Sequence, residues 1–301
     1  MDNNQIRLKG GTINKYRNMI DTHIAPELGD VKLSAISSTI INRYLKQKIK
    51  NGRLDKRGGL SSSYVRSIML IINAAIKFAV AEQLCPPLKT PILKPSNSKT
   101  KITILSVEEQ KKLESHLCRG LDSTKVGVFI SLHTGLRIGE VCALSWDDID
   151  FKNKVIKIRH TVARVRSDDG SKKLTKLIID DPKTPSSARD IPISTSLLPV
   201  LEEAHKLSTS SYVISENAQF TSPRTYEYRY HRLLEESGIT SVNYHTLRHT
   251  FATRCIEAGV DVKSLSEILG HSNVGTTLNT YVHSSMDLKR SQLEKLASVS
   301  A

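Results

Sequence analysis

The chain has 301 residues and a mass of 33.5 kDa, a length that favours two domains over one. Hydrophobic residues make up 39% and charged residues 25%, which supports packed cores and excludes a wholly disordered chain. The 44 basic and 30 acidic residues give a net charge of +14, and this surplus favours a polyanionic partner, most simply nucleic acid.

The basic surplus lies mainly in the first third of the chain. Residues 1–100 hold 17 basic and 6 acidic residues, whereas residues 101–301 hold 27 and 24. Because each Lys or Arg beside a DNA phosphate releases condensed counterions, the first third is the better candidate for gripping a DNA backbone. A solvated basic surface is the alternative on charge alone.

Two helices are predicted near the N-terminus. Thr12 is a candidate N-cap for a helix whose apolar positions recur at helical spacing as far as Ile24, and Pro26 is expected to break it. Ser38 is a candidate cap for a second helix over residues 38–49.

A third, longer helix is predicted to begin at Ser61 or Ser62. Its most apolar stretch, residues 67–81, is interrupted by Asn73 and Lys77. We expect this stretch to be too short and too polar to span a bilayer, which predicts a core helix and no membrane partner.

A proline-rich linker is predicted after these helices, because four prolines fall between residues 86 and 95. The predicted organisation is a helical domain over residues 1–86, a linker over 87–103 and a mixed domain over 104–301. The fold class expected is mainly α with a small antiparallel β-sheet.

The mixed domain is predicted to begin with helices and continue through strands. Ser106 with Glu109 forms a capping-box pattern that opens a helix to about Cys118, and a helix from about Lys125 is expected to end at Gly135. Further strands are predicted over 155–165, 174–180 and 189–193, and helices over 196–207, 223–236, 246–258 and 262–269.

The four cysteines lie far apart and form no C-x-x-C pair. This spacing fits neither a disulfide framework nor a zinc ribbon, and it favours a reducing cytoplasm. No basic-then-apolar signal segment opens the chain, which agrees with a cytoplasmic location.

Two arginines are placed where an anion could bind. Arg137 lies in the segment TGLRIGE just past an apolar helix, and Arg248 lies in HTLRHT at the start of another. Guanidinium forks and free backbone N–H groups at such places can converge on an anion. Glu140 follows Arg137 by three residues and can orient it, although a surface or capping role is the alternative for any single residue of this kind.

Two histidines and a tyrosine complete the candidate site. His245 shares a helix face with Arg248, and His271 follows a helix-ending glycine. Tyr281 becomes a potential nucleophile if cations hold a phosphate beside it, and a packed aromatic is the alternative. His245 and His249 have metal-ligand spacing, but no third ligand stands at helical spacing, so we predict no metal.

These clusters resemble those of the tyrosine recombinases, the phage and mobile-element integrase family, over residues 106–281. The family's catalytic set is Arg…Lys…His-x-x-Arg…His/Trp…Tyr, and the C-terminal motif from HTLRHTFAT through LSEILGHSNVGTTLNTYVH is highly specific. The basic segment INKYRNMIDTHIAPELGDVKLSAI resembles the family's core-DNA-binding domain. The resemblance implies a helical core-DNA-binding domain, an α+β catalytic domain, and the catalytic residues Arg137, Lys183, His245, Arg248, His271 and Tyr281 supported by Glu140.

Lys183 is the least secure member of this set, because the family's lysine lies in a hairpin turn without a tight motif. It stands in DPKTPSSARDIPI, which resembles the family's P-K-T-x-x-S-x-R pattern. Lys172, Lys173 and Lys176 are rivals, and a solvated hairpin lysine is the alternative.

The resemblance implies a site-specific DNA recombinase that cuts and rejoins double-stranded DNA through a 3′-phosphotyrosyl intermediate, without metal or cofactor. It further implies a nucleoid-associated homo-tetramer on paired sites, exchange of a C-terminal helix over residues 286–297, and accessory bending or excision factors. Whether the reaction is integration, excision or resolution stays open.

One departure and three alternatives accompany the resemblance. Many integrases carry an extra helix, and often an arm-site DNA-binding domain, before the segment that here begins at Tyr16, so arm-site binding is in question. A relaxing topoisomerase of the tyrosine type, a non-catalytic DNA-binding protein and a metal-dependent nuclease are the other functions considered.

Overall fold

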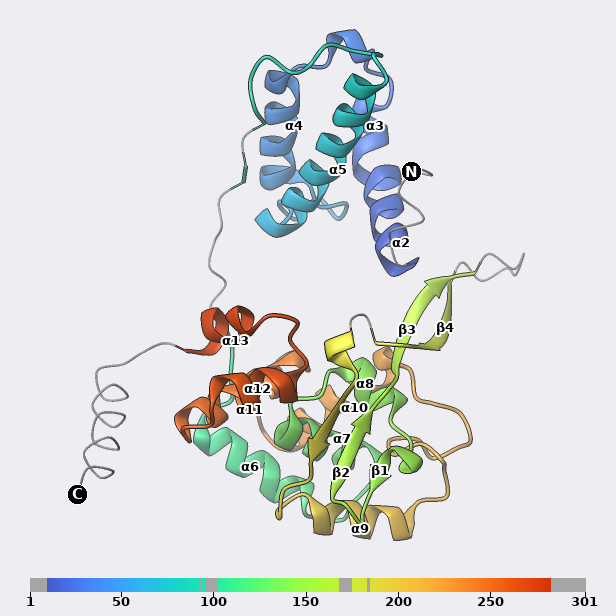
Figure 1. Ribbon diagram of the computed structural model, residues 1–301, viewed down its shortest axis with the longest axis vertical. Helices are drawn as coiled ribbons and strands as arrows, with labels where there is room; N and C mark the ends of the chain where they lie inside the picture. Colours follow the sequence, from blue (N-terminus) through green and yellow to red (C-terminus); the bar gives the residue numbers. More distant parts are fainter. Residues whose placement is uncertain (1–9, 93, 96–101, 168–174, 183–184, 283–301) are drawn as a thin grey trace, which may run out of the picture. The chain divides into compact units, whose positions relative to one another are not determined.

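The computed structural model describes residues 10–92, 94–95, 102–167, 175–182 and 185–282 (Figure 1). Contacts between residues divide the chain into two compact units. The first comprises Met1–Lys101 with Val165–Lys176, and the second comprises Ile102–Arg164 with Leu177–Ala301. The bounds predicted from the sequence for the two domains and the linker stay a prediction.

The helical unit packs its helices around one small apolar core (Figure 1). Its elements are α2 (Gly10–Met19), a π-helical turn η1 (Ile20–Ile24), α3 (Ala25–Leu28), a 3₁₀ turn η2 (Leu33–Ala35), α4 (Ser38–Asn51) and α5 (Ser62–Ala81). The core side chains are Met19, Ile41, Tyr44, Leu45, Val65, Ile68, Met69 and Ile72. Residues 10–92 contain no strand, as the sequence predicts.

The first helix does not stop at Pro26, so that prediction is wrong. The π-helical turn precedes α3, with the Ala25 amide donating to the Ile20 carbonyl, and Pro26 lies in the first turn of α3. A proline is tolerated there because its missing amide would have no helical partner. Thr12 lies inside α2 instead of capping it.

Serine side chains begin the next two helices. The Ser37 hydroxyl accepts a hydrogen bond from the Ile40 amide, so α4 is capped one residue earlier than predicted. Ser38 turns inward instead and donates to the carbonyl of Thr90. Ser61 caps α5 through the Tyr64 amide.

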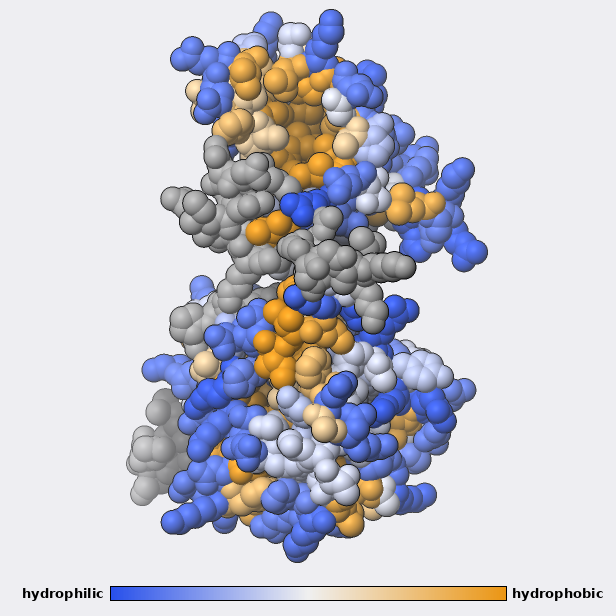
Figure 2. Space-filling model, turned by 90° about the vertical axis from the view of Figure 1, so that its right-hand side faces the viewer, coloured by the Kyte–Doolittle hydropathy of each residue, from blue (hydrophilic) through white to orange (hydrophobic). Residues whose placement is uncertain are grey.

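Helix α5 is longer than the apolar stretch that identified it. Its 20 residues are long and apolar enough, by length and composition alone, to cross a membrane, a test that the core helix of a soluble protein also passes. The expectation of a helix too short to span a bilayer was drawn from the shorter stretch 67–81 and does not hold for the whole helix. One face of α5, including Val65 and Ile68, is nevertheless buried in the core of the unit. Leu70 and Phe78 on α5 are exposed, and Figure 2 shows apolar side chains at the surface of this unit.

The second unit is built around α7 (Ser123–Thr134), which is buried along most of its length. A helix that is apolar on all sides must be surrounded, and α7 contacts five helices. These are α6 (Val107–Leu117), α8 (Ile138–Ala143), α9 (Leu198–Leu207), α10 (Pro223–Glu236) and α11 (His245–Glu257). The capping box of Ser106 and Glu109 opens α6 as predicted.

The strands form two small sheets instead of one. Strands β1 (Ile149–Asp150), β2 (Val155–Ile158) and β5 (Arg189–Pro192) pair antiparallel in the order β1-β2-β5, and β3 (Thr161–Arg166) pairs with β4 (Thr175–Asp180). The strand predicted over 155–165 is thus divided between the two sheets. The predicted class, mainly α with small antiparallel β structure, is confirmed.

Two glycines end the helices that frame the candidate site. Gly135 ends α7 with φ +67°, and Gly270 ends α12 (Val262–Leu269) with φ +65°, both in the left-handed region that favours glycine. Short helices follow each glycine: α8 after Gly135, and α13 (Val274–Tyr281) after Gly270. Neither short helix is predicted from the sequence.

Candidate active site

Arg137 lies at the start of α8, where it is held by a residue of the same turn. Its Nη1 donates to Glu140 Oε1 at 2.8 Å, and its backbone amide donates to Glu140 Oε2 at 3.0 Å. Its Nη2 reaches the Gly270 carbonyl at 3.4 Å. The Arg137 side chain is 36% exposed, so part of the guanidinium faces outward.

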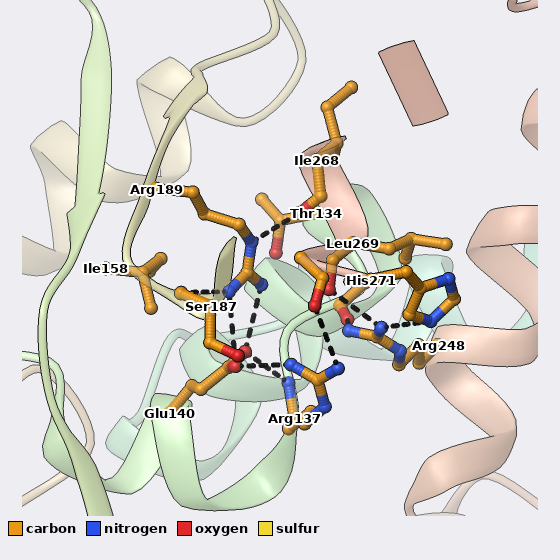
Figure 3. Close-up of polar contacts among 12 residues, drawn as sticks. Thr134, Arg137, Glu140, Ile158, Ser187, Arg189, Arg248, Ile268, Leu269 and His271 are labelled. Carbon is orange, nitrogen blue, oxygen red and sulfur yellow. Dashed lines mark hydrogen bonds and ion pairs between the residues drawn. The ribbon is translucent and has the colours of Figure 1, made fainter. Parts of the chain in front are cut away.

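Glu140 is buried and joins two arginines (Figure 3). Arg189, at the start of β5, donates from Nη2 to Oε2 at 3.0 Å and from Nη1 to Oε1 at 3.2 Å. Burial acts to raise the pKa of Glu140, but the hydrogen bonds and charge of Arg189, followed by the charge of Arg137, more than offset it and lower the pKa. Glu140 is therefore ionised and fixes Arg137 in place.

Arg248 is almost completely buried, at 1% exposure, and is held mainly by backbone. Its Nη1 donates to the carbonyl of Gly135 at 2.9 Å and its Nη2 to the carbonyl of Leu269 at 2.8 Å (Figure 3). Burial, followed by the charge of Arg137, lowers the pKa of Arg248 to about 9, so it stays protonated at neutral pH. Since Leu269 and Gly270 are adjacent, the two arginines lie side by side.

His271 lies against Arg248. Its Nε2 is 2.8 Å from Arg248 Nη2, and its Nδ1 is 2.8 Å from Thr277 Oγ1. A guanidinium only donates, so Nε2 accepts and the ring proton is on Nδ1, directed at Thr277. Burial, followed by the charges of Arg248 and Arg137, lowers the pKa of His271 to about 4, so the ring is neutral at pH 7.

Tyr281, the last residue of α13, is buried beside the same arginines. Its hydroxyl is 2.8 Å from Nδ1 of His249. Burial raises the pKa of Tyr281, and the charges of Arg248 and Arg137 act against this rise. His245 packs edge to face on His249, with ring centroids 4.6 Å apart, and desolvation followed by the charges of its neighbours lowers the pKa of His245 to about 4.

Some of the predicted residues lie outside the described ranges. These are Lys183, its rivals Lys172 and Lys173, and the helix predicted over 286–297. Lys176, the remaining rival, is an exposed residue of β4. Among the described residues, no group of three or more His, Cys, Asp or Glu side chains could hold a metal ion.

Comparison with known proteins places the chain in a family. Residues 104–287 match the phage integrase family, and residues 1–49 match the phage integrase N-terminal SAM-like domain. The chain belongs to the phage integrase family. It is a tyrosine-type site-specific DNA recombinase, as the resemblance in the sequence predicts.

Named relatives of this integrase include recombinases and mobile-element enzymes. A XerC-like tyrosine recombinase of Caldanaerobacter subterraneus is 31% identical, over 93% of this chain and 75% of that protein. The ICEBs1 integrase of Bacillus subtilis is 25% identical, over 94% of this chain and 77% of that protein. The transposase of transposon Tn916 from Enterococcus faecalis is 27% identical, and here the match spans 64% of this chain and about half of that protein, 51%.

Solved structures share the fold. The Tn1549 transposon integrase in complex with transposon right end DNA is 23% identical, with a TM-score of 0.78 and coverage of 97% of this chain and 95% of that chain. A lambda integrase dimer bound to a core site is 19% identical, with a TM-score of 0.67 and coverage of 92% and 90%.

Two residues of this integrase site are missing from the sequence-based set. Arg189 is the first residue of the strand predicted over 189–193 and the arginine that ends the P-K-T-x-x-S-x-R pattern, and this pattern is the signal that points to it. His249 was considered only as a metal ligand with His245, although it adjoins Arg248 in HTLRHT. Both are brought into the pocket by pairing or packing between distant segments.

Proposed function

We propose that Tyr281 attacks a scissile DNA phosphodiester and forms a 3′-phosphotyrosyl bond, freeing a 5′-hydroxyl. The observation that carries this proposal is the placement of Arg137 and Arg248 on adjacent carbonyls, with the buried Tyr281 next to them. Two cations beside one phenol suit a reaction in which negative charge grows on phosphate oxygens. A later attack by another 5′-hydroxyl rejoins the strands without ATP, because the phosphotyrosyl bond conserves the energy of the broken bond.

Arg137 and Arg248 bind the two non-bridging oxygens of this phosphate. Glu140 fixes the orientation of Arg137, whose partly exposed guanidinium presents donors to a ligand. Neutral His271 accepts from Arg248 and steadies its fork, while His245 donates a further hydrogen bond to the phosphate or relays protons. These cationic side chains supply the electrostatic stabilisation, so the reaction needs neither metal nor cofactor.

Lys183 is the general acid that protonates the departing 5′-oxygen. It fits this role through its place in the segment joining β4 and β5, which leads directly to Arg189 at the site. An ammonium near the leaving oxygen can donate a proton as the bond to phosphorus breaks.

The DNA substrate is an attachment or core site, and the process served is integration or excision of a mobile element. The similarity to the ICEBs1 integrase and to the Tn916 transposase supports this context. The protein acts in the cytoplasm at the nucleoid as a homo-tetramer on two paired sites, exchanging the segment over residues 286–297, and accessory bending or excision factors assist it. The net charge of +14 supports phosphate contacts whose affinity falls steeply with salt.

A nicked suicide duplex tests the nucleophile. The wild-type chain is expected to leave a covalent protein–DNA adduct on a denaturing gel, including in EDTA. Tyr281→Phe abolishes the adduct while duplex binding persists, because only the phenol oxygen is removed. An undiminished adduct from the variant would falsify the assignment of Tyr281.

The general acid has its own test. Lys183→Ala is expected to slow cleavage, and a substrate with a 5′-bridging sulfur restores the rate, because a thiolate leaves without protonation. Absence of rescue would contradict this role of Lys183 and point to another lysine.

A further inference from the structure

His249 touches the atom that reacts. It follows Arg248 on α11, and its Nδ1 lies 2.8 Å from the Tyr281 hydroxyl oxygen, with ring centroids 5.6 Å apart. The function proposed above gives this histidine no role. Its position at the nucleophile itself distinguishes it from His245 and His271.

The phenol proton points at His249 for a simple reason. Tyr281 is only 7% exposed, so its O–H group requires a protein acceptor. The nearby guanidinium groups of Arg248 and Arg137 only donate, whereas Nδ1 of a neutral imidazole accepts. Among the described residues, Nδ1 of His249 is the ring nitrogen recorded within hydrogen-bond distance of the hydroxyl.

His249 is also in the protonation state that lets it accept a proton. Burial, followed by the charge of Arg248, lowers the pKa of His249, so its ring is neutral at pH 7. The other two histidines are differently engaged: both ring nitrogens of His271 face Arg248 and Thr277. His245 contacts the ring of His249 on the same helix.

We propose that His249 is the general base that takes the phenol proton of Tyr281 during strand cleavage. The proposal rests on the proposed function and deepens it. As the bond from the Tyr281 oxygen to phosphorus forms, the proton passes to Nδ1 of His249. The bond from phosphorus to the 5′-oxygen breaks with its electron pair on that oxygen, which the general acid protonates.

Rejoining runs the same transfers backwards. The incoming 5′-hydroxyl attacks phosphorus and gives its proton to the deprotonated general acid. Tyr281 leaves as the phenolate, and His249 returns the proton to it. No external oxidant, metal or second base is needed, and the imidazolium formed in between lies next to the bound phosphodiester anion.

The test is single-turnover cleavage of a suicide duplex by the full chain carrying His249→Asn. Asparagine keeps a short polar group near the position of Nδ1 but has no basic nitrogen. Cleavage is expected to slow by about a hundredfold, the lower range for loss of a general base. His231→Asn is the matched control, since His231 is a half-buried residue of α10 that bonds to Ser241 and contacts none of the described residues of the candidate site, and it should leave the rate unchanged.

A second measurement separates proton transfer from a structural role. Replacing Tyr281 by 3,5-difluorotyrosine makes the phenol more acidic, so less help from a base is required. This replacement is expected to recover about tenfold of the rate lost in His249→Asn or in His249→Gln and to change the wild-type rate little. Equal losses with tyrosine and difluorotyrosine would overturn the proposal.

The two hypotheses fail in distinguishable ways. A wild-type chain that forms no Tyr281-dependent adduct refutes the proposed function. A wild-type chain that forms the adduct, together with His249→Asn and His249→Gln variants that bind duplex and cleave at the wild-type rate, refutes the role of His249 alone.

Discussion

Arg137 and Arg248 lie side by side in the candidate site but are held by different kinds of group. Arg248 is bound by the carbonyls of Gly135 and Leu269, at the C-terminal ends of α7 and α12, where the helix dipoles are negative. Arg137 is held by a carboxylate, Glu140, which Arg189 fixes in turn. One cation is thus positioned by the backbone of the fold, and the other by a chain of charged side chains.

This difference gives the two arginines different roles in the fold and in ligand binding. Arg248 is buried at 1% exposure and is part of the core, so its loss affects folding and chemistry together. Arg137 is 36% exposed and keeps freedom to meet a ligand, but its orientation depends on Glu140. Mutations of Arg248 and of Arg137 should therefore affect folding and ligand binding to different extents.

The largest effect is expected from Glu140→Gln. The substitution leaves Arg189 buried without a counter-ion and releases Arg137, and breaking a buried ion pair costs about 3–5 kcal/mol. Urea unfolding measures this loss. The matched control is Glu236→Gln, which breaks an exposed pair with Arg232 and should cost at most about 0.5 kcal/mol. Equal small losses would show that the Glu140 network does not support the fold.

The two arginines themselves give the next contrast. Arg248→Lys keeps the charge, but its single nitrogen cannot occupy the positions of both Nη1 and Nη2, so it should lower the free energy of unfolding by about 1–3 kcal/mol. Arg137→Lys should change stability by less than about 1 kcal/mol, yet cut adduct formation by about 10²–10³-fold through loss of a fixed donor. Urea unfolding and single-turnover cleavage would record the two effects, and an equally destabilising Arg137→Lys would contradict the comparison.

The sequence predicts the features that depend on neighbouring residues and misses those that depend on distant ones. Capping signals such as Ser106 with Glu109 and helix-ending glycines are local, so helices α10 and α12 have the predicted bounds. The Arg137–Glu140 pair is also local, three residues apart on one turn. The Arg189–Glu140 bond spans 49 residues and depends on how β5 lies against α8, which no local pattern encodes.

The predicted end of the first helix is wrong for a related reason. Pro26 is a local helix breaker, but it lies in the first turn of α3, directly after the π-helical turn. Its missing amide would have no helical partner there, so the chain continues into α3. Likewise the short helices α8 and α13 have too few residues for a periodic signal, although both carry site residues.

Gly270→Ala tests the backbone between the two arginines. At φ +65° an alanine is strained, and its Cβ would lie 3.0 Å from Arg189 Nη1 and from the Ser186 carbonyl. We expect a loss of about 1–3 kcal/mol in urea unfolding. Gly120→Ala is the control, because Gly120 has φ +72° with open space around it. This variant should lose only the free energy that the strained backbone conformation costs an alanine. Equal losses would mean that crowding at Arg189 is unimportant.

The smallest expected effect is in the pH dependence of stability. It comes from His271, which accepts a hydrogen bond from Arg248. The folded-state pKa of His271 is lowered to about 4 by burial and by Arg248, whereas the unfolded ring has its ordinary pKa near 6.5. As pH falls, the unfolded chain therefore takes up this proton first, and stability decreases from about pH 6.5 down to about pH 4. Between pH 7 and pH 6 the loss from His271 should be less than about 1 kcal/mol. His271→Gln, which can still accept from Arg248, should make the slope of unfolding free energy against pH shallower. The control His231→Gln, at a half-buried residue of α10 away from Arg248, should leave the slope unchanged. A slope that His271→Gln leaves unaltered would mean that neither burial nor the charge of Arg248 lowers the pKa of this ring in the folded chain.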